Sequence, residues 1–238
     1  MINKVTIVLV FLFLSNLTIG QVIPLRLKID AINYNDSINK RTFTINYHIE
    51  NLTNKELTYF LNPTDFISNT RASLATKIAC KIYQDNDLIN VDDIVIDENT
   101  FKIKSKLKEA KTDKEKALIV DEYLKTEGLN LNDNNPIDSL TLSKLKSEKL
   151  FSSMQTIRPN ETKSYTKKLF WDKTRYYKLD DNEFYLDEKS NHYLEISITL
   201  LKEEYQKTVS KEMFETITKN TNFVKGSFVS NRHLINFQ

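Results

Sequence analysis

Strict alternation of apolar and polar side chains is the feature that most limits the folds available to this chain. Every second side chain in residues 42–49 is apolar: Phe43, Ile45, Tyr47 and Ile49 lie between Thr42, Thr44, Asn46 and His48. The same period of two runs through residues 25–30 and through HYLEISITLLK at 192–202. Because successive side chains of a strand point to opposite faces, each of these segments predicts a half-buried β-strand.

Shorter extended segments occur along the rest of the chain. They are residues 56–61, 78–82, 91–96 and 165–171, and two short stretches around the turn at 230–232. Many short strands separated by turn signals are typical of two sheets packed face to face. We therefore expect a mainly β chain with a two-sheet sandwich, formed by a single domain over residues 21–238.

A helical insertion is expected at about residues 101–155. Residues 104–128 are rich in helix formers, with a capping box from Thr112 to Glu115 and Gly128 as a C-terminal stop. The spacing of apolar residues predicts a second helix from about Ser139 to Met154. A short helix near 206–219 is expected from the four-residue spacing of its apolar side chains: Val209, Met213 and Ile217.

Glycine is scarce, with three residues in 238. Phosphate-binding loops, nucleotide fingerprints and nucleophile elbows all require glycine, because the backbone must approach a ligand closely or adopt a positive φ. None of these motifs is present in the sequence. Turns are expected to rely on Asn and Asp instead, in NLTNK, DNDLIN, NDNNP and DDNE.

The first 20 residues have the layout of a secretory signal peptide. A positive charge at Lys4 precedes an apolar stretch from Val5 to Leu14, and small residues lead to Gly20. We expect an exported chain, periplasmic or extracellular, without stable membrane insertion after cleavage. The single cysteine, Cys80, alternates with Ile78 and Ile82, so it is expected to be a small core residue.

Charge and residue types exclude several classes of function. The sequence has 34 Lys and Arg against 32 Asp and Glu, a balance that does not favour nucleic acid as a partner. The three histidines, His48, His192 and His233, are far apart in sequence and are expected at the surface or at strand edges. No cofactor and no catalytic residue is predicted, so the chain is not expected to be an enzyme.

Acidic residues provide a weak calcium candidate. Oxygen ligands from Asp85, Asp87, Asp92 and Asp93 suit calcium, which is abundant outside cells. However, the stretch lacks the central glycine of a calcium loop, and apolar residues interrupt it as they do in a strand with one polar face. The solvated strand is therefore the favoured interpretation of this stretch.

A basic stretch rich in aromatic rings, TIRPNETKSYTKKLFWDKTRYY, covers residues 156–177. Alternation places Tyr165, Leu169 and Trp171 on one face, so Trp171 is expected to lie in the core between sheets. Candidate binding residues are the other rings and the turn before them: Phe170, Tyr176 and Tyr177, with Pro159, Asn160 and Glu161.

Several segments resemble bacterial extracytoplasmic immunoglobulin-like domains. IENLTNKELTYFL at 49–61 is similar to two of their strands and the turn between, and GSFVSNRHLINF at 226–237 to their closing strands. IRPNETKSY at 157–165, followed by Trp171, resembles their Pro-containing turn and tryptophan strand, also found in bacterial proteinase-inhibitor sandwiches. Asn160 replaces the usual glycine, and residues 101–155 have no counterpart. The resemblance implies an immunoglobulin-like sandwich and carries no catalytic residue.

The expected function is binding. The leading hypothesis is a secreted, non-enzymatic protein that binds another protein or a surface component, through the helical insertion. The alternative is an inhibitor of secreted proteinases that presents residues 156–163 around Pro159. A hydrolase with two carboxylates is the third hypothesis, but nothing in the sequence selects a particular pair.

Overall fold

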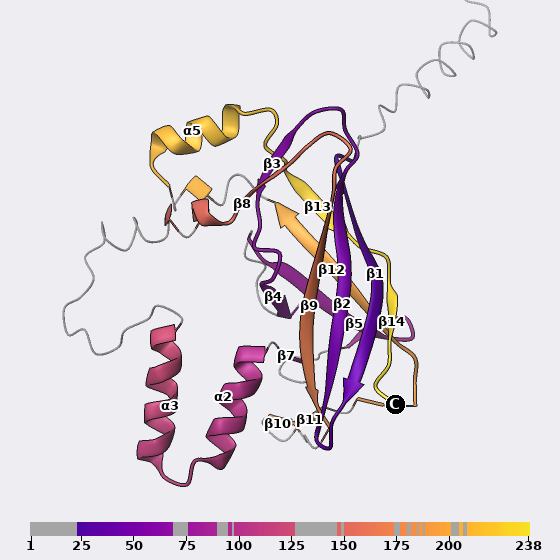
Figure 1. Ribbon diagram of the computed structural model, residues 1–238, viewed down its shortest axis with the longest axis vertical. Coiled ribbons are helices and arrows are strands. Elements are labelled where there is room, and N and C mark those ends of the chain that lie inside the picture. The colour runs from indigo at the N-terminus through magenta and orange to yellow at the C-terminus, as the bar shows by residue number, and fades with distance from the viewer. Residues whose placement is uncertain are drawn as a thin grey trace, which may run out of the picture.

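The computed structural model is mainly β and contains several sheets (Figure 1). It describes residues 23–68, 76–89, 95–96, 98–126, 147–148, 150–173, 177–179, 182–184, 186–187, 189–200, 205–206 and 209–238. The signal peptide expected at residues 1–20 lies outside this range. Within the described ranges, no helix has the length and apolar character needed to cross a membrane.

The first sheet has four strands in the order β1-β2-β9-β7, and its three observed pairings are antiparallel. The strands are β1 (Leu25–Asp36), β2 (Lys40–Asn51), β9 (Thr162–Asp172) and β7 (Val95–Ile96). β2 lies between two long neighbours and alternates strictly between buried and half-buried residues. The predicted period of two is confirmed in this strand.

The second sheet has six strands, with the central order β13-β12-β5-β4; β14 also pairs with β12, and β6 with β5. The strands are β4 (Phe66–Ser68), β5 (Ile78–Gln84), β6 (Asp87–Ile89), β12 (His192–Leu200), β13 (Gly226–Val229) and β14 (His233–Ile235). The two short strands predicted around residues 230–232 are therefore confirmed. Two small two-stranded sheets are also present: β3 (Leu57–Phe60) with β8 (Met154–Ile157), and β10 (Tyr177–Leu179) with β11 (Asn182–Phe184).

The inward side chains of the two large sheets form one hydrophobic core. Phe237, next to the C-terminus, contacts both sheets. Its ring centroid lies 5.1 Å from those of Phe43 and Trp171 in the first sheet and 5.1 Å from that of His192 on β12 in the second. Trp171 is 5% exposed, so its predicted place in the core is confirmed. Cys80 is also buried, and burial raises the pKa of its thiol to about 12, which keeps the thiol protonated.

The helical region differs from the expected pattern. The helix predicted over residues 104–128 is two helices, α2 (Glu98–Glu109) and α3 (Asp113–Thr126). The predicted capping box is confirmed, and it begins α3: the Glu115 carboxylate accepts from the Thr112 N–H at 3.2 Å, and Thr112 Oγ1 accepts from the Glu115 N–H at 3.2 Å. A cap provides hydrogen-bond partners for the first amide groups of a helix. The capping box therefore marks the start of a new helix and divides the predicted helix into two.

The other helix predictions are right in part. Residues 139–146 lie outside the described chain, and Met154, expected at a helix end, begins strand β8. The third helix is α5 (Lys211–Lys219), whose N-cap Ser210 accepts from the Met213 N–H. Met213 is 45% exposed, and Ile217 carries the buried contact of α5. A second apolar cluster anchors this helix near β3, through the residues Phe60, Leu150, Tyr205, Val209, Ile217 and Phe223.

Asp and Asn replace glycine at two turns. Asp85, in the turn between β5 and β6, has φ 52°, and Asn160, in the turn before β9, has φ 55°. Both values lie in the left-handed region, which Asn and Asp tolerate better than other residues with a side chain. The prediction that turns in this chain rely on these residue types is confirmed at both sites.

Candidate functional site

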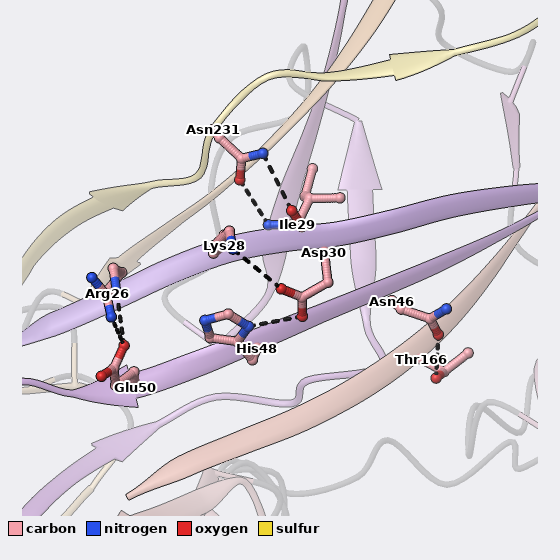
Figure 2. Close-up of polar contacts among 9 residues, drawn as sticks. All are labelled: Arg26, Lys28, Ile29, Asp30, Asn46, His48, Glu50, Thr166 and Asn231. Atoms are coloured by element: carbon pink, nitrogen blue, oxygen red, sulfur yellow. Dashed lines mark hydrogen bonds and ion pairs between the residues drawn. The ribbon is translucent and has the colours of Figure 1, made fainter. Parts of the chain in front are cut away.

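The outer face of the β1-β2-β9 sheet is polar and largely paired (Figure 2). Arg26 Nε donates to the Glu50 carboxylate at 2.7 Å. His48 Nδ1 lies 2.8 Å from Asp30 Oδ2, and Asp30 also pairs with Lys28 at 3.8 Å. Arg26–Glu50 and Asp30–His48 join β1 to β2, whereas Lys28 and Asp30 lie on the same strand. Each pair stabilises the sheet by less than about 1 kcal/mol because it faces solvent.

A β-bulge places Asp30 beside His48. The pairing of β1 with β2 shifts register between Ile29 and Ala31, so Asp30 is an extra residue. The Asn231 side chain occupies the edge of β1 at this point: its amide donates to the Ile29 carbonyl at 3.2 Å, and its oxygen accepts from the Ile29 N–H at 2.9 Å (Figure 2). The turn between β13 and β14 thereby satisfies the outer backbone groups of β1 at Ile29.

Ser164 on β9 is paired in register with His48, so Asp30, His48 and Ser164 follow one another across three strands. Such a set needs a hydrogen bond from the nucleophile to the base. Within the described chain, no hydrogen bond joins Ser164 to His48. The three side chains also lie on a sheet face that carries polar pairs, and this geometry does not favour acyl transfer.

The turn at residues 158–161 is exposed and internally braced. The Arg158 N–H donates to Glu161 Oε2 at 2.6 Å, and the Glu161 N–H donates to the Arg158 carbonyl at 3.1 Å. Pro159 and Asn160 are exposed at its tip, and Glu161 is half-buried. The predicted candidate residues Pro159, Asn160 and Glu161 thus lie together on one rigid turn.

Asn51 fastens this turn to β2, a role that the sequence pattern did not reveal. Its amide is fully buried and donates to three carbonyl groups, those of Lys55 at 2.7 Å, Ile157 at 3.2 Å and Arg158 at 2.9 Å. Its oxygen accepts from the Thr53 N–H at 2.9 Å. In sequence, Asn51 differs in nothing from the other Asn residues of the turns, so only the structure shows that it joins two of them.

Helix α2 covers Phe170, one of the three aromatic rings predicted as binding residues. Phe170 points away from Trp171 as expected, but it is 5% exposed, because Phe101 of α2 stacks on it at 5.5 Å between centroids. Lys40 Nζ lies above both rings, at 5.1 Å from Phe101 and 5.5 Å from Phe170. Phe170 is thus an anchor for the insertion and offers no open ring. Tyr176 lies outside the described residues, and Tyr177 pairs through its backbone with Phe184.

Two of the four calcium candidates lie beside the turn between β5 and β6. Asp85 is in that turn and Asp87 begins β6, while Asp92 and Asp93 lie outside the described residues. In the described part of the chain, no group of three or more His, Cys, Asp or Glu side chains is placed to hold a metal ion. The geometry therefore adds no support to a calcium site.

His192 departs from the prediction of a surface or strand-edge position. It is 1% exposed, and its ring stands edge-on to Phe237 with centroids 5.1 Å apart. Burial lowers the pKa of His192, which favours the neutral imidazole in the folded protein. Nε2 has no hydrogen-bond partner among the described residues. By contrast, His48 is half-buried on the outer face of β2, and His233 is half-buried and pairs in register with Leu194.

Arg41 secures the segment next to His192. It is 3% exposed and donates to both oxygens of Asp36, at 2.6 Å each, and to the Asn236 carbonyl at 2.6 Å. Its hydrogen bonds to Asp36 lower the pKa of that carboxyl to about 2, with a further contribution from Lys173. The pair thus remains charged above about pH 4 and holds the C-terminal segment against β2.

The helical hairpin carries exposed apolar side chains. α2 packs on the outer face of β9 through Phe101, and α3 packs against α2, where Lys106 bonds to Glu122 at 3.3 Å (Figure 1). Leu118 and Val120 of α3 are 61% and 40% exposed. They flank Ile119, so the apolar arc of α3 is wider than a single neighbouring helix can cover.

Comparison with protein-family models, with curated proteins and with solved structures gives no match.

Proposed function

We propose that the chain is an exported, non-catalytic protein that binds another protein or a surface component through the α2–α3 hairpin. Its scaffold in this proposal is an immunoglobulin-like sandwich, supported by the single core shared by the two large sheets and by the resemblance of the strand and turn segments. The scaffold holds the hairpin by the stacked pair Phe101 and Phe170. Recognition elements on rigid β scaffolds are commonly of this kind.

The observation that carries the proposal is the exposure of Leu118 and Val120 on two sides of Ile119. A helix whose apolar arc exceeds one narrow stripe is normally covered by more than one neighbour. α2 covers one side of α3. A partner protein that covers Leu118 or Val120 would bury the remaining apolar surface, which is worth about 25 cal/mol per Å² removed from water.

Replacing both Leu118 and Val120 by Ser is expected to weaken partner capture about tenfold or more, because the apolar anchor is lost whichever of the two the partner covers. The measurement is a quantitative pull-down from the native secretome with the chain lacking residues 1–20. Lys111→Ser combined with Lys114→Ser is the matched control, since both lysines are exposed, Lys111 just before α3 and Lys114 in its first turn. Equal capture by the Leu118/Val120 double variant and by the control would refute the role of α3.

Inhibition of secreted proteinases is the second candidate, favoured by the exposed and braced turn at residues 158–161. An inhibitor gains affinity when its loop is ordered before binding. At micromolar concentration the protein should slow at least one trypsin-like proteinase in a panel, and Arg158→Ala should abolish this effect. If no proteinase turns over more slowly, the inhibitor hypothesis is dismissed, and the binding proposal stands or falls by the α3 variants.

A further inference from the structure

β9 is an edge strand over most of its length. β7 pairs only with Phe170 and Trp171, at the C-terminal end of β9. From Thr162 to Leu169, β9 pairs with β2 on one side, and no strand of the described chain pairs with its other side. An edge of this kind presents N–H and C=O groups that a further strand can use.

The hydrogen bonds at both ends of β9 show which backbone groups face this open side. The Asn51 N–H donates to the Glu161 carbonyl at 3.0 Å, and the Lys173 N–H donates to the Asn39 carbonyl at 2.9 Å. Odd-numbered residues of β9 therefore direct their backbone groups toward β2. In an antiparallel pair the direction alternates, so Thr162, Ser164 and Thr166 direct theirs to the open side.

Lysines dominate this edge. Lys163, Lys167 and Lys168 have no ion-pair partner within the described residues. Lys163 Nζ donates to the Thr156 carbonyl at 2.5 Å, and Lys167 Nζ donates to the Thr64 carbonyl at 2.7 Å. These two ammonium groups are thus held near the edge on the core side of β9, while Lys168 is exposed on the outer face.

We propose that the open edge of β9 takes up an extended, acidic segment of a partner protein by β-strand addition. The backbone groups of Thr162, Ser164 and Thr166 would supply the ladder, and the three lysines would favour acidic side chains in the added strand. The same charges oppose a second copy of the chain, because two β9 edges paired side by side would bring like charges together. This surface is separate from α3 and does not depend on the function proposed above.

The test uses a fluorescein-labelled peptide of nine residues that alternates threonine with glutamate, titrated with the protein by fluorescence anisotropy. The expected result is saturable binding that weakens as salt is added, and much weaker binding of the same peptide with lysine in place of glutamate. Ser164→Pro removes an outward N–H, so it is expected to weaken binding at least tenfold. Proline is tolerated in a strand where its N–H would face away from the sheet.

Lys168→Glu tests the charge without altering the backbone and is also expected to weaken binding at least tenfold. It keeps the proposal testable if Ser164→Pro does not fold. Lys225→Glu is its matched control, because Lys225 is exposed and lies away from β9, and it should bind the peptide as the parent does. Retained binding in Lys168→Glu, or in folded Ser164→Pro, would overturn the proposal.

Two further outcomes would also overturn it. One is equal affinity for the glutamate and lysine peptides, which would show that charge does not select the strand. The other is a dimer in sedimentation experiments that Ser164→Pro dissociates, which would make a second copy of the chain the occupant. Loss of partner capture in the α3 variants leaves this test unaffected, so the two proposals can fail independently.

Discussion

Replacing Phe237 by Ala is expected to lower the free energy of unfolding by about 3–5 kcal/mol, the usual cost of removing a buried aromatic ring. The ring is 2% exposed and meets the rings of Phe43, Trp171 and His192, each at 5.1 Å between centroids. Because these residues belong to β2, β9 and β12, the lost ring leaves a cavity where the two large sheets meet. Urea unfolding followed by tryptophan fluorescence measures the change directly.

Leu234→Ala is the matched control for Phe237→Ala. Leu234 lies in the same closing segment but is 52% exposed, so its truncation should cost less than about 1 kcal/mol. A second measurement is the pKa of His192, followed by NMR. Burial lowers this pKa in the parent, so admission of water in Phe237→Ala should raise it toward the ordinary value of 6.5. Equal stability losses in the two variants would contradict the assigned role of Phe237.

Replacing Asn51 by Leu is expected to cost about 2–4 kcal/mol, because it removes a buried amide that donates to three carbonyl groups. The fully buried amide of Asn51 donates to Ile157 and Arg158 on one side and to Lys55 on the other. Leucine has a similar volume but no hydrogen-bonding group, so packing is largely kept while the bridge between the two turns is lost. Denaturant unfolding gives the stability change.

Asn62→Ala is the corresponding control. Asn62 is exposed, and its side chain accepts from Thr64 N at 3.3 Å and from Thr64 Oγ1 at 3.0 Å within its own turn. Its loss should cost less than about 1 kcal/mol, since water can replace these bonds. Hydrogen exchange of the Glu161 amide, which bonds to Arg158 in the braced turn, should accelerate in Asn51→Leu and stay unchanged in Asn62→Ala. The opposite pattern would show that Asn51 does not hold the turn.

Local features were predictable wherever neighbouring residues in the sequence decide the conformation. Alternation over residues 42–49 identified β2, and the capping box at Thr112 and Glu115 identified a helix start. The positive φ of Asp85 and Asn160 follows from turn chemistry in a chain almost without glycine. Each of these features depends on contacts within about four residues, which the sequence shows directly.

The candidate surfaces were predictable only in part. Pro159, Asn160 and Glu161 lie on one exposed turn, but alternation alone could not show that Phe170 is covered. The cover is Phe101, which reaches β9 from a different element of the fold. The prediction that His192 lies at the surface or at a strand edge was wrong for the same reason. Its burial depends on Phe237, which lies next to the C-terminus, far from His192 in the sequence.

Local sequence was enough to set the period of the strands, the residue types of the turns and the place where α3 begins. It did so because side-chain direction and hydrogen bonding are set locally by the backbone. Three features could be seen only in the folded chain: Phe237 contacts both sheets, Asn51 holds two turns together, and among the described residues most of β9 has a strand on one side only. These features arise from contacts between distant segments, whose register and cover depend on how the whole core packs.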